Sequence, residues 1–526
     1  MTQGAPSVGT VIAHVSTFTL SGLEPRRVTV EVDLRAGLPT FTIVGLGDQA
    51  VREARERVRA AIHNSGFAFP DKRVTVNLAP AYLRKSGPGF DLAIACGVLA
   101  ASGQIPLERL ERLAVFGELA LGGAIRPGRG VLAVAEGVRA VGLEGLVVAA
   151  QRAGEAALVD AITVHGAASL AQAAAVLRGL PVDDRPNGGA GLRERNGPKP
   201  AGSLPVAMVD LADVRGHASV LGSLTIAAAG GHNLLLTGPP GTGKTMLARR
   251  LPSILPPLTR GEALEVTRIQ SVVGLRGATS SLVVERPFRA PHHHISASGL
   301  VGGGAVPVPG EATLAHHGVL FLDELSEFSR DALEALRQPL EDGRVAIVRG
   351  QQTAIYPTRI MLVAATNPCP CGYLGSDRCQ CSEPDLARHR RRLSGPLLDR
   401  IDLQVHVARP SAEELRGPAH CVSATERDRV IAARERQLAR LEGSRATCNA
   451  HMDAAQVRRL IRLEPDAERE LWRDYDKGTL SARGHQRVLR VARTVADLAG
   501  SDKVGRVHVL HALGLRRDGV AEAESA

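Results

Sequence analysis

Hydrophobic and polar residues alternate over the first third of the chain in patterns that predict both strands and helices. Residues 28–32 and 74–78 place apolar side chains at every second position, as strands with one buried face do. Residues 48–64 instead carry apolar side chains at helical spacing, namely Val51, Ala54, Val58, Ala61 and Ile62. We therefore expect residues 1–180 to form one domain that mixes helices and strands.

The composition changes beyond this domain. Residues 181–204 are rich in proline, glycine and charged side chains and lack apolar periodicity, so we expect a flexible linker there. A second pattern of strands and helices covers residues 205–410, helices rich in Arg, Ala and Leu dominate residues 411–517, and residues 518–526 are expected to fray. The sequence thus predicts a multidomain α/β protein with an all-α domain near its C-terminus.

The overall composition limits the classes of function. The 526 residues leave room for about three domains, and 64 Lys and Arg against 54 Asp and Glu give a net charge of +10, which favours anionic partners such as nucleic acids or nucleotides. Aromatic residues make up only 3%, which argues against binding dominated by base stacking. Neither a signal peptide nor an apolar run of ~18–20 residues is recognisable, so we expect a cytoplasmic protein with no membrane partner.

The clearest chemical signal follows an apolar strand predicted at residues 233–237. The next residues fit the pattern G-x-x-x-x-G-K-[ST] and are Gly238, Pro239, Pro240, Gly241, Thr242, Gly243, Lys244 and Thr245. Such glycines let several backbone N–H groups point at one anion. We expect this loop to bind ATP, with Lys244 on the β- and γ-phosphates and Thr245 on Mg²⁺.

Two more apolar strands end in polar side chains. Residues 318–322 run into Asp323 and Glu324, and residues 359–365 run into Asn367. Ligands of open α/β sheets bind at the carboxyl ends of the strands. We expect Asp323 to hold Mg²⁺ through water, Glu324 to polarise the attacking water, and Asn367 to bond the γ-phosphate or that water. Taken alone, a helix N-cap explains the acidic pair equally well, and a turn before proline explains the asparagine.

Several further motifs resemble one family. They are residues 286–293, 302–304, 309–311, 316–325, 367–372, 394–402, 480–483 and 491–498. Together they resemble the Mg-chelatase-like AAA+ ATPases of the ComM/YifB type over nearly the whole chain outside the linker and tail. The resemblance implies an AAA+ P-loop core, a C-terminal helical lid and a homo-hexameric ring that uses ATP and Mg²⁺.

For the function, the resemblance implies a motor that moves on single-stranded or branched DNA. The ComM branch implies branch migration in recombination during natural transformation, with recombination proteins as further partners. A magnesium-chelatase-like ATPase that drives metal insertion or remodels a partner protein is the alternative, because one fold serves several functions.

The resemblance also assigns roles to two arginines. Arg400 looks like the arginine finger that reaches a γ-phosphate bound to a neighbouring subunit, where a guanidinium stabilises the transition-state charge. Arg483 is similar to the second sensor at the head of a lid helix. For both, the alternative is a surface arginine paired with Asp399 or Asp402.

Residues 345–356 predict a strand, a tight turn at Gly350 and a second strand. The related MCM helicases carry a hairpin in this place, with a basic tip that follows DNA through the pore. The resemblance therefore makes Arg349 the candidate DNA-binding residue of the tip.

Two clusters of metal-binding residue types remain. Cys369, Cys371, Cys379 and Cys381 have the spacing C-x-C-x₇-C-x-C, which fits a tetrahedral Zn²⁺ site, with free thiols as the alternative. Residues 292–294 are three histidines, which the resemblance places on a loop that faces the pore or the nucleotide. Three adjacent histidines are not expected to converge on one ion.

The N-terminal domain resembles the Lon-protease-like domain in residues 73–81, 85–95 and 117–127. Active Lon proteases place a nucleophilic serine after Gly-Pro and a partner lysine in the later segment. Here Gly89 follows Gly-Pro, and the lysine position falls at about Leu132. We therefore expect a non-proteolytic α+β domain for assembly or DNA binding. Its candidate phosphate contacts are Arg84, Lys85, Arg126 and Arg129, with solvated surface charge as the favoured alternative for each. A Lon-like protease is the least favoured alternative.

Overall fold

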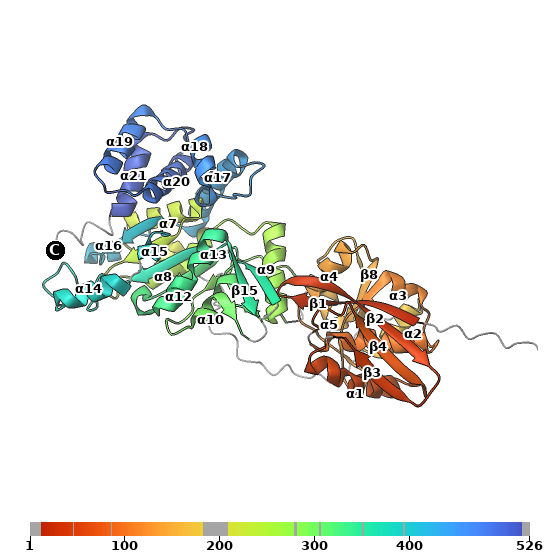
Figure 1. Ribbon diagram of the computed structural model, residues 1–526. Coiled ribbons are helices and arrows are strands. Elements are labelled where there is room, and N and C mark those ends of the chain that lie inside the picture. The colour runs from red at the N-terminus through yellow and green to blue at the C-terminus, as the bar shows by residue number, and fades with distance from the viewer. Residues whose placement is uncertain are drawn as a thin grey trace, which may run out of the picture. The chain divides into compact units, whose positions relative to one another are not determined.

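The structure is a computed structural model that describes residues 12–45, 47–85, 87–181, 209–277, 281–304, 307–349, 352–392 and 395–517 (Figure 1). These residues form two units. The first takes the chain up to residue 197 together with residues 263–283 and 352–354, and the second takes the remainder. The expected linker at 181–204, apart from Pro181, and the tail at 518–526 lie outside the described residues.

The first unit is built on strands and a few helices. Its strands are β1 (Ile12–Ser21), β2 (Glu24–Arg35), β3 (Thr40–Val44), β4 (Arg73–Ala79), β5 (Leu113–Val115), β6 (Glu118–Leu119), β7 (Ile125–Arg126), β8 (Gly145–Ala149) and β9 (Thr163–Ala167). Its helices are α1 (Gln49–Asn64), α2 (Asp91–Ala101), α3 (Glu108–Arg112), α4 (Val131–Ala140), α5 (Ala150–Ala156) and α6 (Leu170–Leu177). Seven strands form one mixed sheet in the order β3-β4-β2-β1-β5-β8-β9.

The predicted amphipathic helix is α1. Asp48 caps it by accepting a hydrogen bond from the backbone N–H of Val51 at 3.0 Å. All five predicted apolar positions of the helix are buried in the same core as side chains of β2 and β4. The apolar periodicity therefore predicts both the helix and its buried face correctly.

Residues 263–283 belong to the first unit, although they follow the phosphate loop in the sequence. Ser271 donates a hydrogen bond to the buried carboxylate of Glu155, and Arg152 donates to the backbone carbonyl of Arg276 at 3.0 Å. These contacts are polar and join distant parts of the chain. Apolar periodicity within the segment does not reveal them.

The second unit holds the remaining elements. Its strands are β10 (Leu234–Thr237), β11 (Phe288–Arg289), β12 (Gly302–Gly303), β13 (Val308–Pro309), β14 (Val319–Leu322), β15 (Arg344–Arg349), β16 (Gln352–Pro357), β17 (Met361–Thr366) and β18 (Leu403–His406). Its first helices are α7 (Ala218–Gly230), α8 (Lys244–Arg250), α9 (Arg260–Val273, which passes into the first unit), α10 (Ala297–Val301), α11 (Glu311–Leu314), α12 (Arg330–Ala335) and α13 (Arg337–Asp342). The later helices are α14 (Glu383–Arg392), α15 (Gly395–Leu398), α16 (Ala412–Arg416), α17 (Ser423–Arg440), α18 (Ala454–Leu460), α19 (Pro465–Asp476), α20 (Ala482–Leu498) and α21 (Arg506–Arg517).

The core of the second unit is a parallel five-stranded sheet in the order β11-β14-β17-β10-β18. The central strands β14 and β17 are buried along their whole length, which explains their uninterrupted apolar sequences. All strands point the same way, so their carboxyl ends share one edge of the sheet and their amino ends share the other. This arrangement confirms the predicted α/β fold.

The C-terminal helices α17 to α21 form an all-α region, which Figure 1 draws in blue, and α17 and α20 pack against α7. A buried polar network holds these helices together around Asp497. Its carboxylate accepts hydrogen bonds from Asn449 (2.8 Å), Arg440 (3.1 Å) and Arg493 (3.1 Å). Among the described residues no helix is both long and apolar enough to cross a membrane.

Candidate active site

The carboxyl end of β10 leads into the predicted phosphate loop. Gly238 admits no side chain, because a Cβ atom there would lie 2.3 Å from the carbonyl oxygen of Val407. Gly241 and Gly243 have φ angles of +77° and +88°, in the left-handed region that favours glycine. A Cβ atom on Gly241 would meet nothing within 4 Å, so the space beside this turn is open.

Lys244, the first residue of α8, is buried with its ammonium group inside the loop. Its Nζ donates to the carbonyl oxygens of Gly238 (2.6 Å) and Pro239 (2.8 Å) and to Oδ1 of Asn367 (3.0 Å). Burial lowers the pKa of Lys244, and the charge of Asp323 partly opposes this shift. The structure thus brings Lys244 and Asn367 together at the ends of the neighbouring strands β10 and β17.

Asp323 follows β14 and meets the residue next to Lys244. The hydroxyl of Thr245 donates a hydrogen bond to Oδ2 of Asp323 at 2.6 Å, and Oδ1 of Asp323 accepts one from the backbone N–H of Glu324 at 3.0 Å. Hydroxyl and carboxylate oxygens are the ligands that Mg²⁺ prefers. The open glycine turn, the buried ammonium group and this pair of oxygens fit a phosphate chain with its Mg²⁺ ion.

Glu324 leaves the strand end in the left-handed conformation, with a φ angle of +53°. Its carboxylate is more than half exposed, and Oε2 lies 3.3 Å from Nδ1 of His293. Sequence spacing does not indicate this contact, because His293 lies on a separate loop. An exposed, oriented carboxylate beside an imidazole is suited to hold a water molecule.

The three histidines at residues 292–294 lie close together on one loop. Their ring centroids lie 4.1 to 5.1 Å apart, and one nitrogen of each ring lies within 4.8 Å of the others. The chain turns here, and the backbone N–H of His294 donates to Nδ1 of His292 at 3.3 Å. The turn therefore brings the three rings closer together than an extended chain would, while the expectation that they do not converge on one ion stays a prediction.

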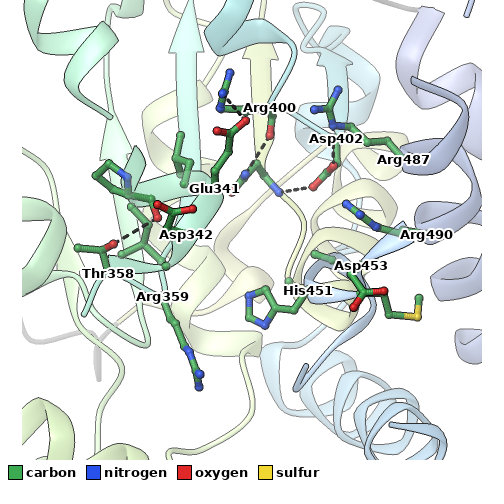
Figure 2. Close-up of a pocket in the computed structure, with 18 of the residues that line it drawn as sticks. Glu341, Asp342, Thr358, Arg359, Arg400, Asp402, His451, Asp453, Arg487 and Arg490 are labelled. Atoms are coloured by element: carbon green, nitrogen blue, oxygen red, sulfur yellow. Dashed lines mark hydrogen bonds and ion pairs between the residues drawn. The ribbon is translucent and has the colours of Figure 1, made fainter. Parts of the chain in front are cut away.

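A polar pocket of about 490 Å³ lies at the other, amino edge of the same sheet (Figure 2). Residues just before three strands line it, namely Asn233, Ile360 and Asp402. Its basic lining residues are Arg359, Arg400, Arg445, Arg483, Arg487 and Arg490. Its acidic lining residues are Glu341, Asp342, Asp402 and Asp453. The basic residues outnumber the acidic ones, so the pocket favours an anion.

Arg400 and Arg483 both line this pocket. Arg400 forms an ion pair with Glu341 of α13, a partner that the sequence does not indicate. Arg483 lies exposed in the first turn of α20, and Arg487 follows one turn later. Arg487 lies 3.6 Å from Asp402, so that carboxylate already has a basic partner from the lid.

Asp402 organises the buried end of the pocket. Its Oδ2 accepts a hydrogen bond from the backbone N–H of Asn233 at 3.1 Å and lies 3.5 Å from Nδ1 of His232. Burial favours the neutral acid, but the His232 contact and the charges of Arg487 and Arg490 outweigh it and hold the pKa of Asp402 below its usual range. The sequence indicates Asp402 only as an alternative partner of Arg400 or Arg483 and does not indicate its contacts with Arg487 and Arg490.

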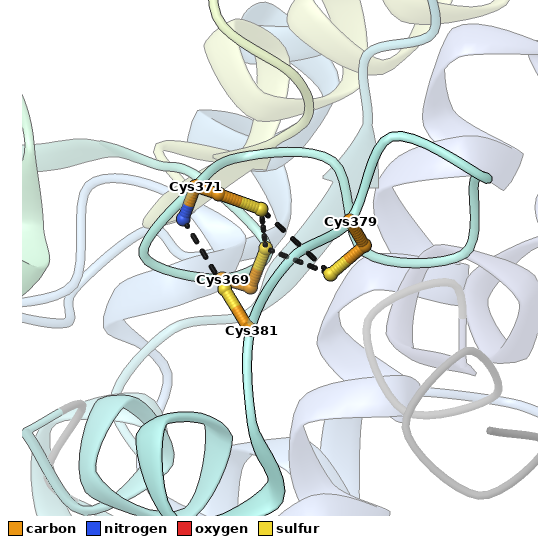
Figure 3. Close-up of side chains that lie close together, drawn as sticks. All are labelled: Cys369, Cys371, Cys379 and Cys381. Atoms are coloured by element: carbon orange, nitrogen blue, oxygen red, sulfur yellow. Dashed lines mark hydrogen bonds between the residues drawn. The ribbon is translucent and has the colours of Figure 1, made fainter.

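The four cysteines lie together in the loop between β17 and α14 (Figure 3). The Sγ atoms are 3.4 Å apart for Cys369 and Cys371, 3.9 Å for Cys369 and Cys379, and 3.7 Å for Cys371 and Cys379. The backbone N–H of Cys371 donates to Sγ of Cys381 at 3.4 Å. Backbone hydrogen bonds lower the pKa of Cys371 to about 6, whereas burial raises that of Cys369 to about 12.

The predicted DNA-binding hairpin consists of β15 and β16. Val345 and Ile347 are buried and Val348 is exposed, as expected for a strand with one covered face. Arg349 is the last residue of β15. Its side chain and the turn residue Gly350 lie outside the described part of the chain.

The first unit offers no Ser-Lys dyad at the expected positions. A Cβ atom on Gly89 would lie 2.6 Å from the ring of Phe116, and Leu132 is buried in the same apolar cluster as Phe116. Lys85 is fully buried, and its ammonium group donates to a backbone carbonyl. The expectation that Lys85 is available to phosphate is therefore wrong, because its charge is already satisfied inside the fold.

The parallel sheet, the phosphate loop after strand β10 and the acidic residues after β14 define an AAA+-like P-loop ATPase. The family model described as magnesium chelatase, subunit ChlI, matches residues 210–415. Two further models, for subunit ChlI of Mg-chelatase and for the C-terminal part of ChlI, match residues 30–152 and 421–516.

Individual relatives cover almost the whole chain. It is 41% identical to the competence protein ComM of Haemophilus influenzae over 512 residues, which are 96% of this chain and 97% of that protein. It is 42% identical to the uncharacterized protein YifB of Escherichia coli over 516 residues, with the same coverage. It is 44% identical to an uncharacterized protein of Mycobacterium tuberculosis over 509 residues, 97% of this chain and 99% of that protein. The chain belongs to the Mg-chelatase-like family of ComM and YifB.

Proposed function

We propose that this protein is an ATP-driven motor that works as a ring of identical subunits, which the family resemblance puts at six. The proposal rests on one observation, which is that the residues of the candidate site lie at two opposite edges of the same sheet. Lys244 and Asp323 lie at the carboxyl edge, whereas Arg400 and Arg483 line the pocket at the amino edge. A head-to-tail contact between copies would put the arginines of one subunit over the phosphate loop of the next.

Within one subunit, the glycine loop and Lys244 would bind and orient the β- and γ-phosphates of ATP. Thr245 and Asp323 would hold Mg²⁺, which supplies positive charge to the phosphate oxygens when bound. Glu324 would orient and polarise the attacking water, with His293 positioning its carboxylate. Asn367 would accept from Lys244 and donate its amide N–H to the γ-phosphate or to the water.

The neighbouring subunit would complete the site with Arg400. Its guanidinium group is held by Glu341, and in the assembled ring it would exchange this carboxylate for the γ-phosphate, which accepts equally strong charge-assisted hydrogen bonds. Arg483 would reach the same nucleotide from the head of α20. Both arginines would therefore act on the nucleotide bound to the neighbouring subunit.

We propose branched DNA as the polymer on which the motor works, with branch migration in recombination as the activity. The relative from Haemophilus influenzae is named a competence protein, and the net charge of +10 favours a polyanion. Helix α14 adds exposed basic residues at Arg388, Arg390, Arg391 and Arg392. The tip of the hairpin, at Arg349, is the proposed contact with the strand that moves.

The test is ATP turnover of the full chain with no DNA, single-stranded DNA, duplex DNA and a four-way junction, together with the oligomeric state with and without ATP. We expect a nucleotide-stabilised oligomer whose turnover rises most with the junction. The Lys244→Ala chain is the control for contaminating ATPases. The proposal would be contradicted if the chain stays monomeric at saturating ATP and none of the DNA substrates changes its ATP turnover.

A further inference from the structure

The loop between β17 and α14 has little apolar core of its own. Its residues 370–382 contain neither helix nor strand, and most of their side chains are exposed or half-buried. Yet the Sγ atoms of Cys369, Cys371, Cys379 and Cys381 all lie within 4.8 Å of one another. A loop this long without secondary structure needs another source of stability.

The spacing of the sulfur atoms matches one tetrahedral ion. Four thiolates about 2.3 Å from a zinc ion lie about 3.8 Å from each other, because the edge of a tetrahedron is ~1.6 times its radius. The Sγ atoms of Cys369, Cys371 and Cys379 lie 3.4, 3.7 and 3.9 Å apart, and Sγ of Cys381 lies within 4.8 Å of each. An iron–sulfur cluster distributes its four thiolates over more than one iron atom, which spreads them more widely. A single ion therefore fits better than a cluster.

We propose that the four cysteines bind one structural Zn²⁺ ion and that this site fixes the loop that carries Asn367 against the phosphate loop. The backbone N–H of Cys371, which donates to Sγ of Cys381 at 3.4 Å, is the type of outer contact that orients a thiolate ligand. Nothing in the ATPase chemistry itself requires a second metal site. The importance of the zinc for turnover rests on the proposed ATPase function.

Two contacts connect the cysteine loop to the candidate active site. Asn367 lies two residues before Cys369 and accepts the hydrogen bond from Lys244 at 3.0 Å. Gly372, one residue after Cys371, lies so close to Pro240 of the phosphate loop that a Cβ atom there would be 2.5 Å from its Cδ. A displacement of the cysteine loop would therefore move both Asn367 and one wall of the phosphate loop.

The first measurement is metal content. The full chain, purified without chelators, should contain about one zinc ion and no iron, and so should the control Cys421→Ser, which replaces a half-buried thiol outside the cluster. The double variant Cys371→Ser/Cys379→Ser should lose the zinc. Replacement of zinc by Co²⁺ should produce the absorption bands of a tetrahedral thiolate site in the first two proteins only. Iron in place of zinc, or no metal in the full chain, would overturn the proposal.

The second measurement is ATP turnover, which tests the coupling. Loss of zinc should reduce turnover on the order of 10- to 100-fold, as expected when a catalytic group is displaced. Circular dichroism checks that the double variant stays folded. If the zinc is present and its removal leaves turnover unchanged, the coupling is wrong. If zinc is present and the unaltered chain hydrolyses no ATP, the ATPase proposal fails while the metal site stands.

Discussion

Arg400 and Arg483 line one pocket at the amino edge of the β11-β14-β17-β10-β18 sheet, on the opposite side from Lys244. The strand β10, with four residues, separates the two edges by at least about 10 Å at ~3.3 Å per residue. Neither arginine therefore shares a site with the Lys244 of its own chain. The proposed ring requires this separation, because there the arginines act on the phosphate loop of a neighbouring copy.

If Arg400 serves the next subunit, two inactive variants should complement each other. We expect Lys244→Ala and Arg400→Ala to lose turnover individually, the arginine variant by about 10³-fold or more, as for other arginine fingers. In an equal mixture that assembles at random, about one interface in four combines an intact Lys244 with an intact Arg400 of its neighbour. The mixture should therefore regain a measurable fraction of the unaltered turnover.

A matched mixture keeps this prediction testable. Lys244→Ala mixed with Lys244→Ala/Arg400→Ala contains no intact phosphate loop and should stay inactive. Mixtures are measured after exchange of subunits in the absence of ATP. A first mixture as inactive as the second, in a sample that contains mixed oligomers, would contradict a role of Arg400 across the interface.

A substitution of Glu324 should slow ATP hydrolysis without weakening ATP binding. Its carboxylate lies outside the loop that surrounds Lys244, so Glu324→Gln should bind ATP nearly as well as the unaltered chain but turn it over on the order of 10²-fold more slowly, because it loses the general base. Binding of a fluorescent ATP analogue and steady-state turnover are the two measurements. Equal losses of affinity and turnover would instead indicate a role in nucleotide binding.

Local sequence predicts the elements of this site better than its contacts. The helix α1 follows directly from apolar periodicity, and the strands β10, β14 and β17 follow from uninterrupted apolar runs. The residues at the strand ends come together because parallel strands share an edge. Periodicity does not report contacts between distant loops. The ion pair of Arg400 with Glu341 and the contact of His293 with Glu324 are therefore visible only in the structure.

The sequence does not indicate that residues 263–283 belong to the first unit, because this too depends on contacts between distant parts of the chain. The segment follows the phosphate loop in sequence, so a division of the sequence into continuous ranges assigns it to the ATPase core. Ser271 and Glu155, which lie far apart along the chain, form the hydrogen bond that ties it to the first unit. Buried Lys85 is similar, because its charge predicts a surface residue and only the fold reveals its carbonyl partner.

Arg349 should matter for work on DNA but not for basal hydrolysis. Arg349 ends β15, whereas Arg344 begins the same strand and is exposed, so Arg344→Ala is a control with the same change of charge. We expect Arg349→Ala to keep the basal turnover and to lose DNA-stimulated unwinding by 10-fold or more, about 1.4 kcal/mol. Arg344→Ala should keep both. An Arg349→Ala chain that unwinds a labelled junction at the unaltered rate would exclude the hairpin tip as the DNA contact.

The helical lid should lose stability at mildly acidic pH because of His485. Its ring lies 5.1 Å from that of Trp472 between α19 and α20, and burial lowers the pKa of His485 below its ordinary value of 6.5. Between pH 6.5 and this lower value the unfolded lid binds more protons than the folded lid. The stability that the neutral His485 ring gives the folded lid is therefore complete above pH 6.5. It is lost as the pH falls through the pKa of His485 in the folded lid.

The only tryptophan of the chain, Trp472, reports on this change through its fluorescence. We expect the denaturant midpoint of the lid to fall between about pH 7 and pH 5 more steeply in the unaltered chain than in His485→Phe, which keeps an aromatic ring beside Trp472 but cannot take up a proton. The two chains differ only at residue 485, so parallel pH profiles would show that His485 does not control the stability of the lid.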